Sequence, residues 1–144
     1  MKPVFVLAFI LVFCNLGLGQ QSHAAAGTDS NRYSLNVLVK GLSGGKKYML
    51  YIQLLNPFQK VIQQRRVPVE KNELIISFER VVSGKYAVRY FQDENGNGKF
   101  DRNFMGIPKE GWGYSNDAKG NMSAPRIEDA LFDFKETTTI VINK

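Results

Sequence analysis

The chain has 144 residues, 19 basic against 13 acidic side chains and a formal net charge of +6, which suits one ordinary domain with its own core. The basic residues are scattered, and the densest pairs are Lys46-Lys47 and Arg65-Arg66. We therefore expect solvated strand edges and no nucleic-acid surface.

The N-terminal segment has the pattern of a secretory signal peptide. A basic residue is followed by an apolar run at 4–18 and by small residues that predict cleavage between Ala24 and Ala26. The run is shorter than the roughly 20 residues of a membrane span. We expect a signal peptide at 1–25, one exported domain at 26–144 in the periplasm or outside the cell, and no stable membrane insertion after cleavage.

Cleavage at this place removes the one cysteine, Cys14, and the one histidine, His23. The mature domain would then have neither a thiol nor an imidazole. This excludes a Ser-His-Asp triad, a Cys-His pair, a disulfide and a zinc site of the usual ligands. We accordingly expect a protein that is not an enzyme, and we name no catalytic residue.

Alternation of apolar and polar residues predicts seven short strands and no convincing helix. The strands are expected at 33–39, 47–55, 61–67, 74–79, 86–90, 130–134 and 138–142. The third should lie at a sheet edge, because Pro68 has no N–H to donate to a ladder. The number and even spacing of the strands predict an all-β fold, an antiparallel seven-stranded β-sandwich, with a small barrel as the alternative.

A calcium-loop pattern, DENGNGKFD, directly follows the fifth strand. Its oxygen-bearing residues recur at the spacing that a hard cation needs. The candidate ligands are the side chains of Asp93, Asn95, Asn97 and Asp101, and the backbone carbonyl of Lys99. Phe104 stands where a bidentate glutamate is expected, so the loop alone should bind calcium weakly, near the millimolar range. The alternative is that the two Asn-Gly pairs simply form turns.

A long loop without a sustained strand pattern extends from Phe104 to Ile127, between the fifth and sixth strands. Loops of this length are uncommon in compact domains and are often functional, and this one should lie beside the calcium-like motif. Four acids in or beside it could supply the missing calcium ligand: Glu110, Asp117, Glu128 and Asp129. A pair among Glu110, Glu128 and Asp129 could also act in a glycosidase, although nothing indicates a cleft between them.

Two aromatic residues of this loop, Trp112 and Tyr114, lie beside glycines and could offer ring faces to a carbohydrate. The alternative is that they pack the loop onto the end of the core. The sequence leaves both interpretations open.

Several combined motifs occupy the C-terminal half of the chain. They are a Tyr-rich strand, a D-x-N-x-N-G-x-x-D loop, a Gly-Ile-Pro-x-Glu-Gly-aromatic-Gly-aromatic-Ser-Asn segment and a Pro-x-x-x-Asp-Ala-x-Phe close, from Tyr86 to Gly120 and from Pro125 onward. In these motifs the chain resembles a bacterial exported family, the domain of unknown function 2141 (DUF2141). The first four strands resemble the family only in pattern. The resemblance implies a signal peptide followed by one β-sandwich of the transthyretin-like or immunoglobulin-like kind, with no established activity.

These features together predict a non-enzymatic, exported binding module, with the long loop as its recognition surface and a weak calcium site at 93–101. Its partner would be an envelope protein or a glycan. One alternative is a structural or accessory envelope protein without metal. The other is a carbohydrate-binding or hydrolytic module that uses the loop carboxylates.

Overall fold

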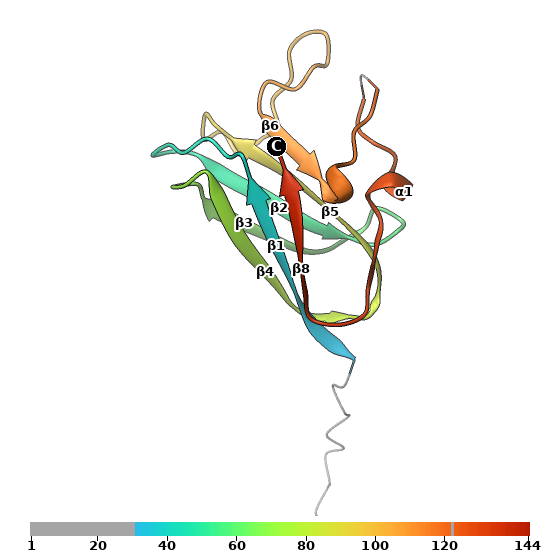
Figure 1. Ribbon diagram of the computed structural model, residues 1–144. Helices are drawn as coiled ribbons and strands as arrows, with labels where there is room; N and C mark the ends of the chain where they lie inside the picture. The colour runs from blue at the N-terminus through green and yellow to red at the C-terminus, as the bar shows by residue number, and fades with distance from the viewer. Residues whose placement is uncertain (1–30, 122) are drawn as a thin grey trace, which may run out of the picture.

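The computed structural model describes residues 31–121 and 123–144, so the expected signal peptide and its cleavage site lie outside the described residues. The described part consists mainly of strands (Figure 1). They are β1 (Arg32–Lys40), β2 (Met49–Leu55), β3 (Val61–Pro68), β4 (Glu73–Val82), β5 (Gly84–Asp93), β6 (Gly111–Tyr114), β7 (Phe132–Phe134) and β8 (Thr138–Asn143). Two short helices, the 3-10 helix η1 (Ser115–Asp117) and α1 (Ile127–Ala130), lie between β6 and β7. Within these ranges no helix has the length and hydropathy to cross a membrane.

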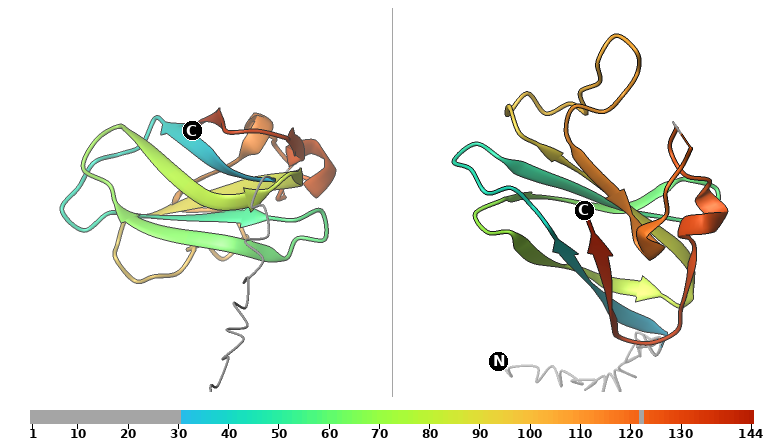
Figure 2. Two further views of the ribbon diagram at one scale, coloured as in Figure 1. Left: turned by 90° about the horizontal axis from the view of Figure 1, so that it is seen from below. Right: turned by 45° about the horizontal axis from the view of Figure 1, so that its top comes forward.

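The strands form two sheets that face each other (Figure 2). One has three strands in the order β4-β1-β8, and the other has five, in which β3-β2-β5-β6 are consecutive and β7 pairs with β5. The expected antiparallel arrangement holds for every pair of named strands except β1 with β8, which is parallel. The exception arises because the chain leaves β7 in one sheet and enters the other sheet beside β1, a connection that alternation along a strand does not reveal.

The inner faces of the two sheets share one hydrophobic core. Side chains alternate across a strand, so every second residue points between the sheets. The largest buried members are Leu35, Leu50, Ile52, Leu54, Phe78, Phe134 and Ile142. Phe134 of β7 packs edge-on against Tyr33 and Tyr86, with ring centroids 6.2 Å apart in each pair. This contact joins the two sheets at the end of the molecule away from the long loop.

The eighth strand, β6, lies where we expected only loop. It pairs antiparallel with β5, with Phe91 opposite Trp112. Its inward positions are glycines, and a Cβ at Gly113 would lie 2.6 Å from Cε1 of Tyr90. Because glycines occupy the places where an apolar side chain would mark a strand, the alternation is present but invisible to a hydrophobicity pattern. The seven-strand expectation was therefore wrong by this one element.

The chain after β6 is held against the outer face of the five-stranded sheet by Ser115, which is fully buried. Its Oγ accepts a hydrogen bond from the N–H of Val88 at 2.9 Å and donates one to the carbonyl of Ala130 at 2.6 Å. Ala130 of α1 then covers Leu55 and Ala87 in a small second core. Part of the expected loop is thus a fixed connection with helical turns.

Tyr90 is the least satisfied polar side chain of the main core. It is 3 % exposed, and within the described residues its hydroxyl has no hydrogen-bond partner. Burial, and to a smaller extent the charge of Asp117, raises the pKa of Tyr90 to about 12. An unfolded tyrosine ionises near pH 10, so its ionisation opposes folding between about pH 10 and pH 12.

Replacing Tyr90 by Phe should therefore change stability in a pH-dependent way. The part of the free energy of unfolding that depends on a neutral Tyr90 is fully present below pH 10. It is lost as pH rises through the folded pKa of about 12. Below pH 9 we expect Tyr90→Phe and the unchanged protein to differ by a constant amount in free energy of unfolding, and above pH 10 the variant should gain relative to the parent. Urea unfolding at pH 8, 10 and 11 measures the difference, with Tyr48→Phe as the control. A difference independent of pH would contradict the assignment.

Candidate functional site

The loop that follows β5 is organised by the carboxylate of Asp93. This side chain is fully buried and accepts backbone N–H groups from Gly96 at 2.7 Å, Asn97 at 3.2 Å and Gly98 at 2.7 Å. Gly96 and Gly98 have φ values of 77° and 74°, which glycine adopts without the strain that a Cβ would bring. Asp93 thereby turns the chain sharply as it leaves the sheet.

Asp101 closes the loop from the other end. Its Oδ2 accepts the side-chain amide N–H groups of Asn95 at 2.5 Å and Asn97 at 2.8 Å. The amide oxygens of the two asparagines accept the backbone N–H groups of Asn97 and Lys99, at 3.0 and 2.8 Å. The asparagines therefore present donors, not oxygen ligands, to Asp101.

Glu110 is the candidate acid that folds back onto this loop. It is 7 % exposed, and its two carboxylate oxygens accept the backbone N–H groups of Glu94 and Asp101, each at 3.1 Å. The other three acids lie elsewhere. Asp117 accepts hydrogen bonds from Asn143 at 2.7 and 2.8 Å. Glu128 is exposed, and the Arg126 guanidinium, 3.0 Å from Asp129, holds the pKa of that carboxyl below its usual value.

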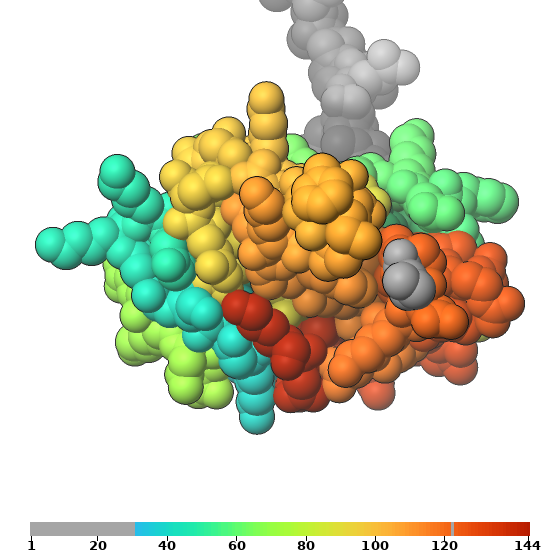
Figure 3. Space-filling view, turned by 90° about the horizontal axis from the view of Figure 1, so that it is seen from above, coloured from blue at the N-terminus to red at the C-terminus, as the bar shows by residue number. Residues whose placement is uncertain are grey.

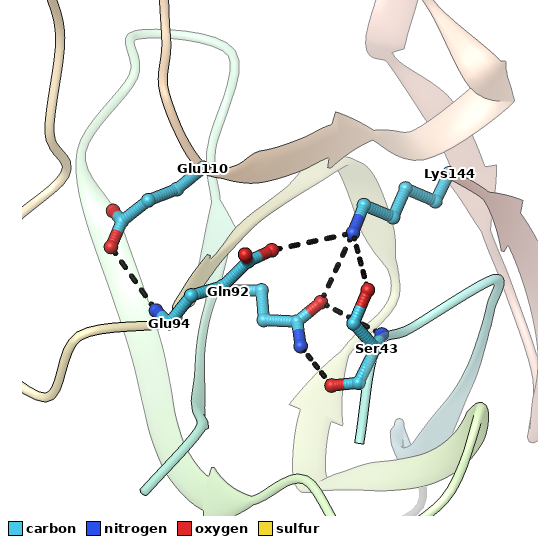
Figure 4. Close-up of polar contacts among 5 residues, drawn as sticks. All are labelled: Ser43, Gln92, Glu94, Glu110 and Lys144. Carbon is cyan, nitrogen blue, oxygen red and sulfur yellow. Dashed lines mark hydrogen bonds and ion pairs between the residues drawn. The ribbon is translucent and has the colours of Figure 1, made fainter. Parts of the chain in front are cut away.

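The base of the loop is fixed by a polar cluster around Gln92 (Figure 4). Gln92 is fully buried, donates to the carbonyl of Ser43 and accepts from the N–H of Ser43 at 3.2 Å. The ammonium group of Lys144 contacts Gln92 Oε1 at 3.3 Å and Glu94 at 3.5 Å. The loop is therefore joined both to the β1–β2 connection and to the last residue of the chain.

In this arrangement the side-chain nitrogens of Asn95 and Asn97, and not their oxygens, face Asp101. Calcium needs six to eight oxygens around one point, whereas here the amide nitrogens of Asn95 and Asn97 converge on Asp101. Over the described ranges, no three acidic, histidine or cysteine side chains are grouped so as to hold a metal. Calcium coordination would require both amides to turn over and to give up their bonds to Asn97 N and Lys99 N.

A cleft of about 630 Å³ lies on the outer face of the five-stranded sheet, beside the loop. The strand register places its aromatic floor in one row, from Tyr51 on β2 through Phe91 on β5 to Trp112 on β6. The rings of Tyr51 and Phe91 are stacked at 4.8 Å and nearly parallel, and Arg66 of β3 lies 5.1 Å above Tyr51. The aromatic row thus crosses three strands of the sheet and has a cation at one end.

A polar row lies next to the aromatic one. In register across the sheet are Gln64, Gln53, Arg89 and Tyr114. Arg89 Nε donates to Gln53 Oε1 at 2.8 Å, and Gln53 Nε2 donates to Gln64 Oε1 at 3.3 Å. This ladder holds the guanidinium of Arg89 within the cleft.

One wall of the cleft is a short hairpin at 101–109. It is closed by backbone bonds from Lys109 N to Asp101 O at 2.9 Å and from Asn103 N to Ile107 O at 2.8 Å. Phe100 at its base packs on Phe91 with ring centroids 5.4 Å apart. Residues 120, 123 and 124 also line the cleft. Figure 3 shows this end of the molecule from above.

Trp112 and Tyr114 do line this cleft, and they contact each other edge to face at 6.0 Å. Tyr51, Phe91 and Arg89 also line the cleft, although the sequence did not mark them as candidate site residues. A signal was available: β2 and β5 bury one face in the core yet carry an aromatic residue on the other face, where polar residues are usual.

Removing the Asp93 carboxylate should unfold the loop and destabilise the domain. Three backbone N–H groups would lose a charged acceptor, so we expect Asp93→Ala to lower the free energy of unfolding by about 2–4 kcal/mol. Urea unfolding measures the loss. Glu128→Ala, at an exposed acid, is the control and should change stability by less than about 0.5 kcal/mol. Equal effects of the two substitutions would show that Asp93 does not organise the loop.

Comparison with known proteins places the chain in one family. The family model described as an uncharacterized protein conserved in bacteria, DUF2141, matches residues 47–142. No protein of curated function and no solved structure has significant similarity to the chain. The match covers more than half of the chain, from β2 into β8, and so includes strands that the motifs alone did not cover. The chain therefore belongs to this bacterial family, DUF2141.

Proposed function

We propose that the protein is an exported, non-enzymatic binding module, a β-sandwich whose ligand site is the cleft on the outer face of β2, β5 and β6. The observation that carries the proposal is the aromatic row of Tyr51, Phe91 and Trp112 on a face of the sheet that lies outside the main core. A contiguous apolar surface outside the core is typical of an interaction site. A cleft of about 630 Å³ also falls in the size range of small-molecule sites.

The hairpin at 101–109 adds to this surface. Met105 and Ile107 line the cleft and are 68 and 51 % exposed, and Phe104 lies beside them in the chain, 98 % exposed. Asn103 Oδ1 accepts the N–H groups of Met105 and Ile107, each at 2.9 Å, so the hairpin presents these side chains on a fixed backbone. Preorganised apolar groups bind a ligand at a lower entropic cost than mobile ones.

The residues of the cleft favour recognition over catalysis. Among its described lining residues are two arginines, a glutamine, a serine and three tyrosines, but no carboxylate, histidine or cysteine. General acid–base catalysis needs a group that exchanges a proton near the working pH, and arginine does not. The export part of the proposal is supported by the signal-peptide pattern at 1–25.

The aromatic floor supports an apolar ligand better than a glycan. Carbohydrate stacking requires a free ring face. One face of Tyr51 is covered by Phe91 and the other is approached by Arg66. A glycan site built on Trp112 and Tyr114, or an accessory envelope role without a small ligand, are the alternatives.

Binding in the cleft can be followed through Trp112, because it is the one tryptophan of the chain. We expect 4-phenylbutyramide, a neutral apolar probe, to change tryptophan fluorescence in a saturable way. Ile107→Ser should weaken this binding about 3- to 10-fold by removing apolar contact. Ile75→Ser is the matched control, because Ile75 is an exposed isoleucine on β4 of the other sheet.

Equal affinities for Ile107→Ser and Ile75→Ser, or no saturable signal, would overturn the cleft as the ligand site. Binding on a glycan array that is lost in Trp112→Ala would instead favour the glycan alternative.

A weak calcium site in the loop at 93–101 is the second candidate, and the placement of Glu110 favours it. Glu110 brings a carboxylate to the loop whose own twelfth position holds Phe104. Titration calorimetry should then show binding near the millimolar range. We expect Glu110→Gln to weaken it at least about 10-fold and Glu128→Gln to leave it unchanged. This candidate would be excluded if calcium at about 10-fold the millimolar range gave neither a heat of binding nor a rise in melting temperature.

A further inference from the structure

The cleft contains positive charge without a protein counter-charge. Arg89 and Arg102 both line it, whereas none of its described lining residues is acidic. Neither arginine belongs to the ion pairs of Lys85 with Asp133, Arg126 with Asp129 or Lys144 with Glu94. The positive charges of the two guanidinium groups are therefore not neutralised by any described acidic side chain that lines the cleft.

Of the two arginines, Arg89 is the better placed to bind an anion. It is partly buried on the sheet, next to the aromatic row, and its Nε atom is held by the neutral oxygen of Gln53 at 2.8 Å. Within the described part of the chain its two Nη groups have no acceptor. A guanidinium that is oriented by one hydrogen bond and has its outer edge free matches the two-oxygen geometry of a carboxylate.

Arg102 approaches from the hairpin. It donates to the carbonyl of Gly106 at 3.2 Å and lies 5.0 Å above the ring of Phe100. Both of these contacts are with neutral groups, so they orient the cation without neutralising it. The cleft thus has one cation on its floor and one on its wall, with apolar and aromatic surface beside them.

We propose that the ligand of this cleft is a small amphipathic carboxylate, whose anionic end pairs with Arg89 and Arg102 and whose apolar body lies against Phe91, Trp112 and Ile107. This inference rests on the proposed binding function and specifies its ligand class. Charge complementarity favours such a ligand, because partly burying a cation without a counter-ion is unfavourable. An incoming anion removes that cost while its apolar part leaves water. The volume of about 630 Å³ suits a small molecule and not a protein segment.

The test compares anionic ligands with neutral amides of the same shape. 4-Phenylbutyrate is paired with 4-phenylbutyramide, and octanoate with octanamide, so that aromatic and acyl bodies are distinguished. Affinities are measured by calorimetry on the purified protein and by Trp112 fluorescence. We expect at least one carboxylate to bind about 10-fold more tightly than its amide. The preference should fall as sodium chloride is raised.

The variants separate the anion contact from the apolar contact. Arg89→Gln should reduce the preference for the carboxylate over its amide to about 2-fold or less. Arg102→Gln should reduce it in part. Lys60→Gln, at an exposed cation that does not line the cleft, is the control for net charge and should leave the preference intact.

The outcomes are distinct for the two proposals. If carboxylates and amides bind equally, the anionic ligand class is overturned and the binding function stands. Tighter binding of octyl phosphate than of octanoate would overturn the carboxylate in favour of a phosphate ester. A preference that survives Arg89→Gln would overturn the role of Arg89. If none of the probes binds, the proposed binding function fails together with its ligand class.

Discussion

The buried carboxylate of Asp93 determines the course of the chain at the functional end of the molecule. By accepting three backbone N–H groups it turns the chain sharply where β5 leaves the sheet. Glu110 then fastens the far end of the excursion to Glu94 and Asp101, which brings β6 back beside β5. These two acids thus help to fix the hairpin at 101–109 relative to the sheet, together with the packing of Phe100 on Phe91.

The cleft follows from the register of three strands, β2, β5 and β6. Because Tyr51 lies opposite Phe91, and Phe91 opposite Trp112, three aromatic residues from distant parts of the chain form one row. The next row begins two residues along each strand and is polar, which places Arg89 and its glutamine partner directly beside apolar surface. A shift of one residue in the pairing would move the aromatic row into the core and remove the site.

Much of the strand layout could be predicted, because alternating burial leaves a period of two in the sequence. Strands β1 to β5, β7 and β8 were found in this way, close to their observed bounds. The pattern failed at β6, where glycines take the inward positions, and it did not indicate the parallel pairing of β1 with β8. The spacing of the candidate calcium ligands correctly placed them in one loop. It could not show that the two asparagines turn their side-chain nitrogens towards Asp101.

The sequence by itself determined that the fold is mainly β, that the chain turns sharply at DENGNGKFD, and which family it belongs to. Each of these depends on local spacing or on motifs of neighbouring residues. Only the tertiary structure decided which acid reaches the loop and which side chains meet in the cleft. Glu110 lies 16 residues beyond Glu94, and Gln53 lies 36 residues before Arg89. Such contacts depend on sheet order and register, which are set by the packing of the whole chain, so no short segment contains them.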